Sequence, residues 1–203
     1  MILGVTGSIG AGKSTVKEEF SRLGWRVFDA DAVCHEIYAD PGSTFFSRIV
    51  ETWGRDTAAP DGRSIDRKKL AQKVFGRPEE LKKLTGLLYP ELEKRLDAAV
   101  AACRKDNADG VFEIPLLFEI GCEKRFDAVL AVWSSFPVRC RRLEEKRDLG
   151  VEEIRKREAS QLPAGEKLER ADLALVNNGS RDLLRRQIEA LSNKFSGMSA
   201  NIK

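Results

Sequence analysis

The sequence predicts an α/β fold in which a parallel sheet of five strands is flanked by helices on both faces. Two patterns carry this prediction: five short apolar segments have the length of buried strands, and the stretches between them have the apolar spacing of helices. Alternating strands and helices are typical of parallel sheets, because each parallel connection needs a long crossover. The 203 residues suffice for one such domain, which we take to span 1–203.

The first strand, Ile2–Thr6, leads through a glycine-rich loop into a helix over Lys13–Leu23, whose apolar face ends at Leu23. The loop, Gly7–Ser14, fits the pattern Gly-x4-Gly-Lys-Ser/Thr without a gap. Glycines let successive backbone N–H groups turn towards an anion, and the helix that follows presents its positive end to it. The pattern therefore predicts a site for nucleotide phosphates.

Individual residues of this loop have distinct expected tasks. Lys13 supplies a mobile cation for the β- and γ-phosphates, and the hydroxyl of Ser14 can join the coordination shell of Mg²⁺. The candidate phosphate-binding residues are Gly10, Ala11, Gly12, Lys13, Ser14 and Thr15, and Ser14 is also the candidate metal ligand.

Four more strands are expected along the chain. They are Arg26–Phe28, Gly110–Ile114, Ala128–Trp133 and Leu173–Val176. After the last strand, apolar residues at helical spacing predict a closing helix whose buried face consists of Leu184, Ile188, Leu191 and Phe195.

A long stretch separates the second strand from the third. It has about eighty residues with helical apolar spacing, too many for a plain crossover. We therefore expect a helical, acceptor-binding insertion over about 37–106, with the turn-rich Ala58–Gly62 as a surface loop inside it.

Two carboxylates follow the second strand. Asp29 and Asp31 lie where open parallel sheets place their chemistry, and they point to opposite sides if the strand continues. A carboxylate near the γ-phosphate can accept the proton of an attacking hydroxyl or hold Mg²⁺ through water. Alternatively, an aspartate caps the next helix, which would begin near Ala32. The spacing alone leaves both roles open.

The segment from Arg139 to Arg157 is rich in charge, with eight Lys or Arg residues interleaved with five acids. Such a stretch is usually a solvated pair of helices with ion pairs on its surface. Phosphoryl transfer, however, needs cations around the transferred group, and a mobile helical lid can supply them while excluding water. We expect a lid over about 138–165 in which one to three arginines contact phosphate, with Arg142 and Arg147 as the candidates.

Composition argues against several other classes of protein. The 35 Lys and Arg residues against 32 Asp and Glu give a net charge of only +3, which leaves no bulk electrostatic case for a nucleic-acid partner. No apolar run approaches the ~20 residues that span a bilayer, and the chain begins in a strand rather than a secretory segment, so we expect a cytoplasmic protein without a membrane partner. The four cysteines form no Cys-x-x-Cys pair and are expected to be free thiols. The oligomeric state and the reactivity of Cys34 stay open.

Several segments occur together in an order that is more selective than the glycine loop alone. They are Thr6–Val16, Asp29–Asp31 with His35, Asp61–Gly62 with Asp66–Arg67, Ile114–Glu119, Arg142–Leu143 with Arg147, Gln161, Glu166–Lys167, Ala171–Asp172 and Asn177–Gly179. Through these segments, and over almost its whole length, the chain resembles the bacterial dephospho-coenzyme A kinase family.

The resemblance implies a P-loop NTPase fold like that of the nucleoside monophosphate kinases, with a helical domain for the acceptor and a lid. It also implies ATP-dependent phosphorylation of the ribose 3′-hydroxyl of dephospho-coenzyme A with Mg²⁺. In this family's pattern Asp31 meets the acceptor hydroxyl, Arg142 and Arg147 are lid arginines, and Asn177 to Gly179 lie near the adenine. The candidate catalytic residues are then Asp31, Lys13 and Arg142, and the candidates for nucleotide binding beyond the loop are Arg147, Asn177 and Gly179.

Two positions depart from the family's pattern. Tyr89 stands before a proline where the family commonly has a histidine, and Glu113 precedes Ile114 where it commonly has an aspartate. Two other functions stay open: a nucleoside or nucleotide monophosphate kinase, which differs only in its acceptor, and a nucleotide-dependent switch or assembly ATPase. A GTP switch is disfavoured because the sequence lacks the guanine-reading pattern Asn-Lys-x-Asp.

Overall fold

The computed structural model of this chain describes the backbone of residues 1–74 and 76–200, and the side chains of 1–74 and 76–195. The chain divides into two compact units. The first comprises Met1–Phe28 and Val100–Lys203, and the second comprises Asp29–Ala99. Every helix among the described residues is too short or too polar to cross a bilayer.

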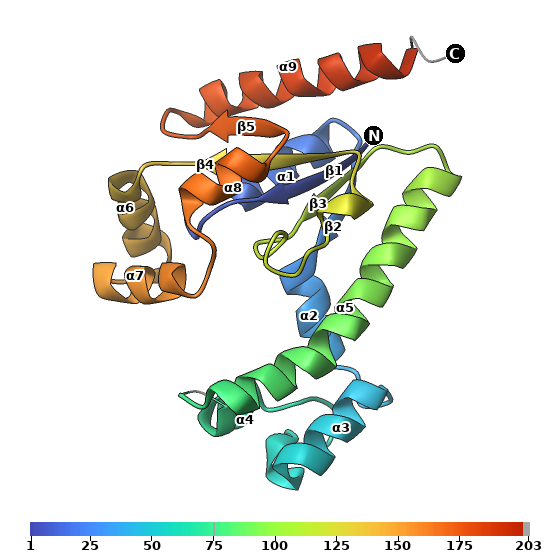
Figure 1. The fold of residues 1–203 in the computed structure, drawn as a ribbon, viewed down its shortest axis with the longest axis vertical. Coiled ribbons are helices and arrows are strands. Elements are labelled where there is room, and N and C mark those ends of the chain that lie inside the picture. Colours follow the sequence, from blue (N-terminus) through green and yellow to red (C-terminus); the bar gives the residue numbers. More distant parts are fainter. Residues whose placement is uncertain (75, 201–203) are drawn as a thin grey trace. The chain divides into compact units, whose positions relative to one another are not determined.

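The first unit is built on a five-stranded sheet in the order β2-β3-β1-β4-β5 (Figure 1). Its strands are β1 Ile2–Thr6, β2 Arg26–Asp29, β3 Gly110–Glu113, β4 Ala128–Trp133 and β5 Leu173–Val176. The central strand β1 runs parallel to β3 and β4, with Val5 opposite Glu113 on one side and Leu130 on the other. The predicted five-stranded parallel sheet is confirmed.

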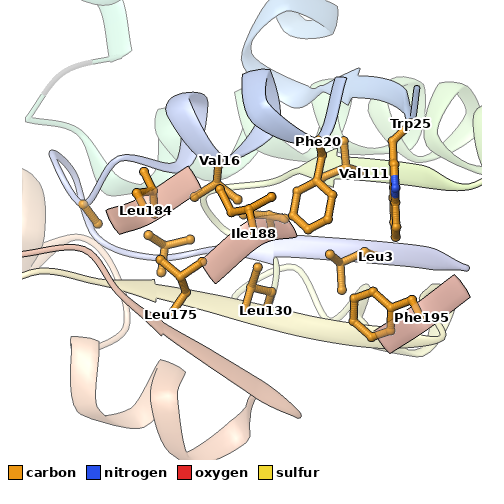
Figure 2. Close-up of a cluster of buried hydrophobic side chains, with 13 residues drawn as sticks. Leu3, Val16, Phe20, Trp25, Val111, Leu130, Leu175, Leu184, Ile188 and Phe195 are labelled. Atoms are coloured by element: carbon orange, nitrogen blue, oxygen red, sulfur yellow. The ribbon is translucent and has the colours of Figure 1, made fainter. Parts of the chain in front are cut away.

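Helices lie between and after the strands of this unit along the chain. They are α1 Lys13–Arg22, α6 Phe136–Arg147, α7 Val151–Ala159, α8 Ala164–Arg170 and α9 Arg181–Ala200, with the short 3-10 turn η2 Glu123–Arg125. Figure 2 shows Phe20 of α1 and Ile188 of α9 pointing into one cluster with Leu3 and Leu130 of the sheet. Leu184, Ile188 and Phe195 are buried and Leu191 is partly buried against them, so the predicted face of the closing helix is confirmed.

The first helix ends earlier than predicted. It stops at Arg22, and Leu23 is 43% exposed instead of lying on the buried face. Gly24 follows with a φ of 88°, a left-handed turn that ends the helix. The turn lets the Trp25 N–H donate to the Phe20 carbonyl at 3.1 Å and brings the two rings to 4.7 Å. Trp25, rather than Leu23, completes this part of the core.

The second unit is helical. It consists of α2 Ala30–Tyr38, α3 Thr44–Trp53, the 3-10 turn η1 Arg55–Thr57, α4 Arg67–Val74 and the part of α5 Pro78–Lys105 that precedes Val100. Ser43 caps α3 by accepting the Phe46 N–H at 3.1 Å, and the Trp53 indole donates to Glu80 at 2.7 Å. The helical character expected here is confirmed, but α5 is one helix that continues through Pro90. The bounds and role of the insertion stay predictions.

Candidate active site

The glycine-rich loop joins the carboxyl end of β1 to the first turn of α1. Gly7, Gly10 and Gly12 have φ angles of 146°, 76° and 99°, which glycine adopts far more readily than other residues. Space is also short, because a Cβ on Gly7 would lie 2.3 Å from the Val132 carbonyl oxygen and one on Gly12 would lie 2.2 Å from Nδ2 of Asn177. The loop therefore needs glycine at these points to pack against β4 and the segment after β5.

A backbone carbonyl of this loop is held from outside. The Asn177 amide donates to the Ala11 carbonyl oxygen at 2.9 Å, and the Ser134 hydroxyl donates to the same oxygen at 3.3 Å. In a trans peptide the C=O and the following N–H point in opposite directions, so holding the Ala11 carbonyl turns the Gly12 N–H the other way. A loop that binds phosphate needs this arrangement, with its N–H groups available to an anion.

Lys13 lies folded over the loop. Its side chain is buried, and Nζ donates to the carbonyl oxygens of Gly7 at 2.9 Å and Ser8 at 3.2 Å. Bonds to an anionic oxygen are stronger than bonds to a neutral carbonyl. The ammonium can therefore exchange these carbonyls for phosphate oxygens by rotation of its own side chain.

Glu113, the last residue of β3, connects to α1 through both carboxylate oxygens. Oε1 accepts from the Ser14 hydroxyl at 3.1 Å, and Oε2 lies 3.0 Å from Nζ of Lys17. A hydroxyl and a carboxylate are the oxygen ligands that Mg²⁺ prefers, so this pair fits a magnesium ion that phosphates also hold. The described residues contain no group of three or more His, Cys, Asp or Glu side chains suited to a metal ion. Sequence reasoning missed Lys17, although its place one helical turn after Lys13 was a signal.

Arg142, on α6, lies beside the residues that hold the loop. Its Nη1 donates to the Ser134 hydroxyl at 3.1 Å, and its Nη2 donates to Oδ1 of Asn177 at 3.4 Å. Burial, and then the neighbouring charge of Arg141, lower the pKa of the Arg142 guanidinium from its ordinary value. An arginine stays protonated at neutral pH even so. The structure thus joins two predicted site residues, Arg142 and Asn177, in one network under the loop.

The other predicted residues of the first unit differ in how far they are exposed to solvent. Arg147 is exposed as the last residue of α6, and Gly179 is exposed after β5. Thr15 is half-buried in α1. The expectation of a solvated face fails for Arg139, which is only 5% exposed because it reaches under the loop.

The start of helix α2, in the second unit, gives Asp29 and Asp31 different positions. β2 ends at Asp29, whose carboxylate accepts the Ala32 N–H at 3.0 Å and so caps α2. Of the two roles that the spacing left open, Asp29 has that of the helix cap, and the helix begins at Ala30 rather than near Ala32, with Asp31 in its first turn. Close by in α2, burial and then the charge of Asp31 raise the pKa of the Cys34 thiol to about 11, while Arg67 acts in the opposite direction.

His35 also has a defined partner within this unit. Its Nε2 lies 2.6 Å from Nη1 of Arg67, and the Arg67 guanidinium lies over the Tyr38 ring at 5.5 Å from its centre. A guanidinium has only donors, so Nε2 is the acceptor and the imidazole proton sits on Nδ1. Burial raises the pKa of Tyr38 to about 12, with the Cys34 thiol adding to the effect.

A glycine loop of this geometry, at the carboxyl end of the central strand of a parallel sheet, defines the P-loop class of nucleotide-binding proteins. The family model described as dephospho-CoA kinase matches residues 1–182. A dephospho-CoA kinase of Geobacillus kaustophilus is 37% identical to the chain over 199 residues, which cover 98% of each.

Solved structures give the same result. The structure of TT1252 from Thermus thermophilus has a TM-score of 0.78 at 34% identity and covers 96% of this chain and 97% of its own. The dephospho-CoA kinase from Campylobacter jejuni has a TM-score of 0.76 at 27% identity and covers 98% of each chain. The chain belongs to the dephospho-CoA kinase family. It is therefore an ATP-dependent kinase for dephospho-coenzyme A, at the last step of coenzyme A biosynthesis.

Proposed function

We propose that this kinase transfers the γ-phosphoryl group of ATP to the ribose 3′-hydroxyl of dephospho-coenzyme A in the presence of Mg²⁺. The observation that supports it most is the loop, in which outside donors hold the Ala11 carbonyl and Lys13 is folded over the backbone. Catalysis of phosphoryl transfer rests mainly on positioning and charge neutralisation, and this geometry serves both.

The loop forms the donor half of the site. Its backbone N–H groups, from Gly10 through Thr15, bind the phosphates, and the Lys13 ammonium neutralises charge on the β- and γ-phosphates. Arg142 and Arg147 belong to a lid over about 138–165 and add positive charge near the transferred group. Asn177 and Gly179 border the adenine, with Asn177 also holding the loop from outside.

Ser14 and Glu113 are the residues that would hold magnesium. When bound, the ion neutralises charge on the β- and γ-phosphates. Ser14 supplies a ligand oxygen, and Glu113 orients that hydroxyl through the contact at 3.1 Å. Lys17, whose Nζ lies 3.0 Å from Oε2 of the same carboxylate, holds Glu113 in place.

The acceptor half is assigned to a helical insertion over about 37–106 and to Asp31. Asp29 already caps α2, which makes Asp31 the better candidate for the carboxylate that accepts the proton of the attacking hydroxyl. Its position two residues after the end of β2 supports this role, because open parallel sheets place their chemistry after the carboxyl ends of strands. A cytoplasmic location, without nucleic-acid or membrane partners, stays a prediction from the sequence.

Two variants test the proposal. With Mg²⁺-ATP and dephospho-coenzyme A, product is detected as coenzyme A by mass and as ADP in a coupled assay. Lys13→Ala should lower kcat/KM by a hundredfold or more, on the order of 10² for a lost transition-state cation. Asp31→Asn should lower kcat far more than it weakens ATP binding.

The acceptor specificity is tested with the same assay. Nucleoside monophosphates should release ADP far more slowly than dephospho-coenzyme A, and ATP alone should give little ADP. Retention of most turnover by Lys13→Ala would refute the assigned loop chemistry. An equal loss of kcat and ATP affinity in Asp31→Asn would instead make Asp31 a binding or structural residue.

A further inference from the structure

Arg139 is a buried cation under the phosphate loop. It lies on α6 and is 5% exposed. Its Nε donates to the Ser134 carbonyl at 3.0 Å, its Nη1 donates to the Ile9 carbonyl at 3.2 Å, and the same nitrogen pairs with the carboxylate of Glu158. A charge removed from water at this depth needs such partners.

The contact with Ile9 bears on the loop itself. Holding the Ile9 carbonyl towards Arg139 turns the next N–H, that of Gly10, to the opposite side of the peptide plane. Gly10 has a φ of 76°, and a Cβ there would lie 3.2 Å from Cβ of Arg139 and 2.9 Å from Cδ1 of Leu143. The Arg139 and Leu143 side chains of α6 thus pack directly on the loop, at the peptide whose direction Arg139 sets.

Glu158 gives Arg139 its counter-charge from another helix. It lies on α7, where its side chain is 26% exposed, against 6% for Arg139. Without that carboxylate the guanidinium would stay buried with two neutral carbonyls and the Phe136 ring, whose centre is 5.3 Å away, and with no counter-charge among these partners. A displacement of α7 would therefore move the Glu158 carboxylate relative to Arg139. Because Arg139 also holds the Ile9 carbonyl, it would change the support of the Ile9–Gly10 peptide.

We propose that Arg139 and Glu158 form a positioning pair that keeps the Gly10 N–H directed at the nucleotide phosphates and connects α7 to the loop. Neither residue contacts the reacting atoms. The proposal rests on the function proposed above only in that the loop binds ATP phosphates. Its consequence is that the pair sets affinity and turnover for ATP, whereas the affinity for the acceptor does not depend on it.

A double-mutant cycle tests the pair. Arg139→Gln, Glu158→Gln and the double variant are compared for kcat and for KM of each substrate, and for ATP binding by calorimetry without acceptor. We expect Arg139→Gln to lower kcat/KM for ATP by about tenfold or more, as for a lost charged hydrogen bond. Glu158→Gln should lower it by less, and the double variant should be no worse than Arg139→Gln, because Glu158 acts through Arg139.

Matched variants separate positioning from simple stability. Glu153→Gln removes an exposed ion pair with Arg157 on the same helix and should leave the kinetics unchanged. Arg139→Lys keeps the charge without the fork of donors and should recover part of the loss. If Arg139→Gln does not fold, Glu158→Gln and Arg139→Lys must still weaken ATP binding.

Several results would overturn the proposal. They are unchanged ATP binding and kinetics despite a lower melting temperature, equal rises in KM for both substrates, and additive effects in the double variant. The wild-type protein in the same assays separates these outcomes from failure of the proposed function, because it must bind ATP and phosphorylate dephospho-coenzyme A.

Discussion

A buried ammonium on α8 offers a sharp test of what holds the site together. Lys167 is 1% exposed, and Nζ donates to the Pro115 carbonyl at 2.7 Å and to Oε1 of Glu119 at 2.8 Å. The Pro115 carbonyl also accepts from the hydroxyl of Thr6, the last residue before the phosphate loop, at 3.1 Å. The same Glu119 oxygen accepts the N–H of Leu162, between α7 and α8, at 2.9 Å. Lys167 therefore ties the start of the loop to the end of the predicted lid.

The change Lys167→Met keeps the length and the apolar stem and removes only the charged donor. Hydrogen bonds that involve a charged group contribute about 1.5–3 kcal/mol each, and breaking a buried ion pair costs about 3–5 kcal/mol. Glu119 is 18% exposed, so water recovers part of that cost. We expect a loss of about 3 kcal/mol in the free energy of unfolding. At about 2–4 °C per kcal/mol for a chain of this size, the melting temperature should fall by about 6–12 °C.

Urea denaturation followed by circular dichroism measures the loss, and a second change identifies its cause. In the Lys167→Met background, Glu119→Gln removes the buried, unpaired charge while its amide oxygen can still accept the Leu162 N–H. It should therefore restore about 1 kcal/mol or more. Arg157→Met, which breaks an exposed pair on α7, is the control and should cost less than about 1 kcal/mol. A loss below about 1 kcal/mol in Lys167→Met, or no recovery in the double variant, would refute the reasoning.

Three further predictions concern glycines and a thiol. Gly12→Ala combines a left-handed φ with a Cβ 2.2 Å from Asn177, and should cost about 2–4 kcal/mol in urea denaturation and raise KM for ATP. Gly86 lies inside α5, and a Cβ added there would meet open space, so Gly86→Ala should instead stabilise the protein by about 0.5–1 kcal/mol. A lower free energy of unfolding would contradict this. Since the pKa of Cys34 is raised from 9.0 to about 11, folding favours the thiol, and its contribution to stability is full below pH 9 and lost between pH 9 and 11. Alkylation of Cys34 by iodoacetamide should have its midpoint near pH 11, and Asp31→Asn should lower that midpoint; a midpoint near pH 9 would contradict the structure.

The sheet could be predicted from the sequence because burial on both faces leaves a direct mark. Ile2–Thr6 and Ala128–Trp133 are mostly apolar runs of strand length, and the structure has the largely buried strands β1 and β4 at those residues. The apolar run Leu173–Val176 also forms a strand, β5, although only Leu175 in it is buried. Boundaries set by single polar contacts were harder. The residues alone left open whether the second strand continues past Asp29. It ends there, because the Asp29 carboxylate accepts the Ala32 N–H and so caps a helix.

Little in the sequence indicated which residues support the phosphate loop from outside. Arg139 and Arg142 both stand in a charged helix of ordinary appearance, and which of them is buried depends on the segment that α6 packs against. Two of the partners of Arg139 are backbone carbonyls, those of Ser134 and Ile9, and such partners have no signature in the sequence. A motif can identify the groups that meet a phosphate, but the groups that aim the loop are known only after folding.

The departure at Glu113 shows how a residue type can be interpreted once its contacts are known. In the sequence, Glu113 is only a departure from the aspartate that the family commonly has at this position. In the structure the longer side chain spans two partners on α1, Ser14 at 3.1 Å from one oxygen and Lys17 at 3.0 Å from the other. An ionised carboxylate at 6% exposure needs a counter-charge, and Lys17 supplies it from the same helix that carries Ser14. The extra methylene thus allows one carboxylate to be neutralised by Lys17 and to orient Ser14 at the same time, so that the proposed magnesium ligand and its support belong to a single unit of the chain.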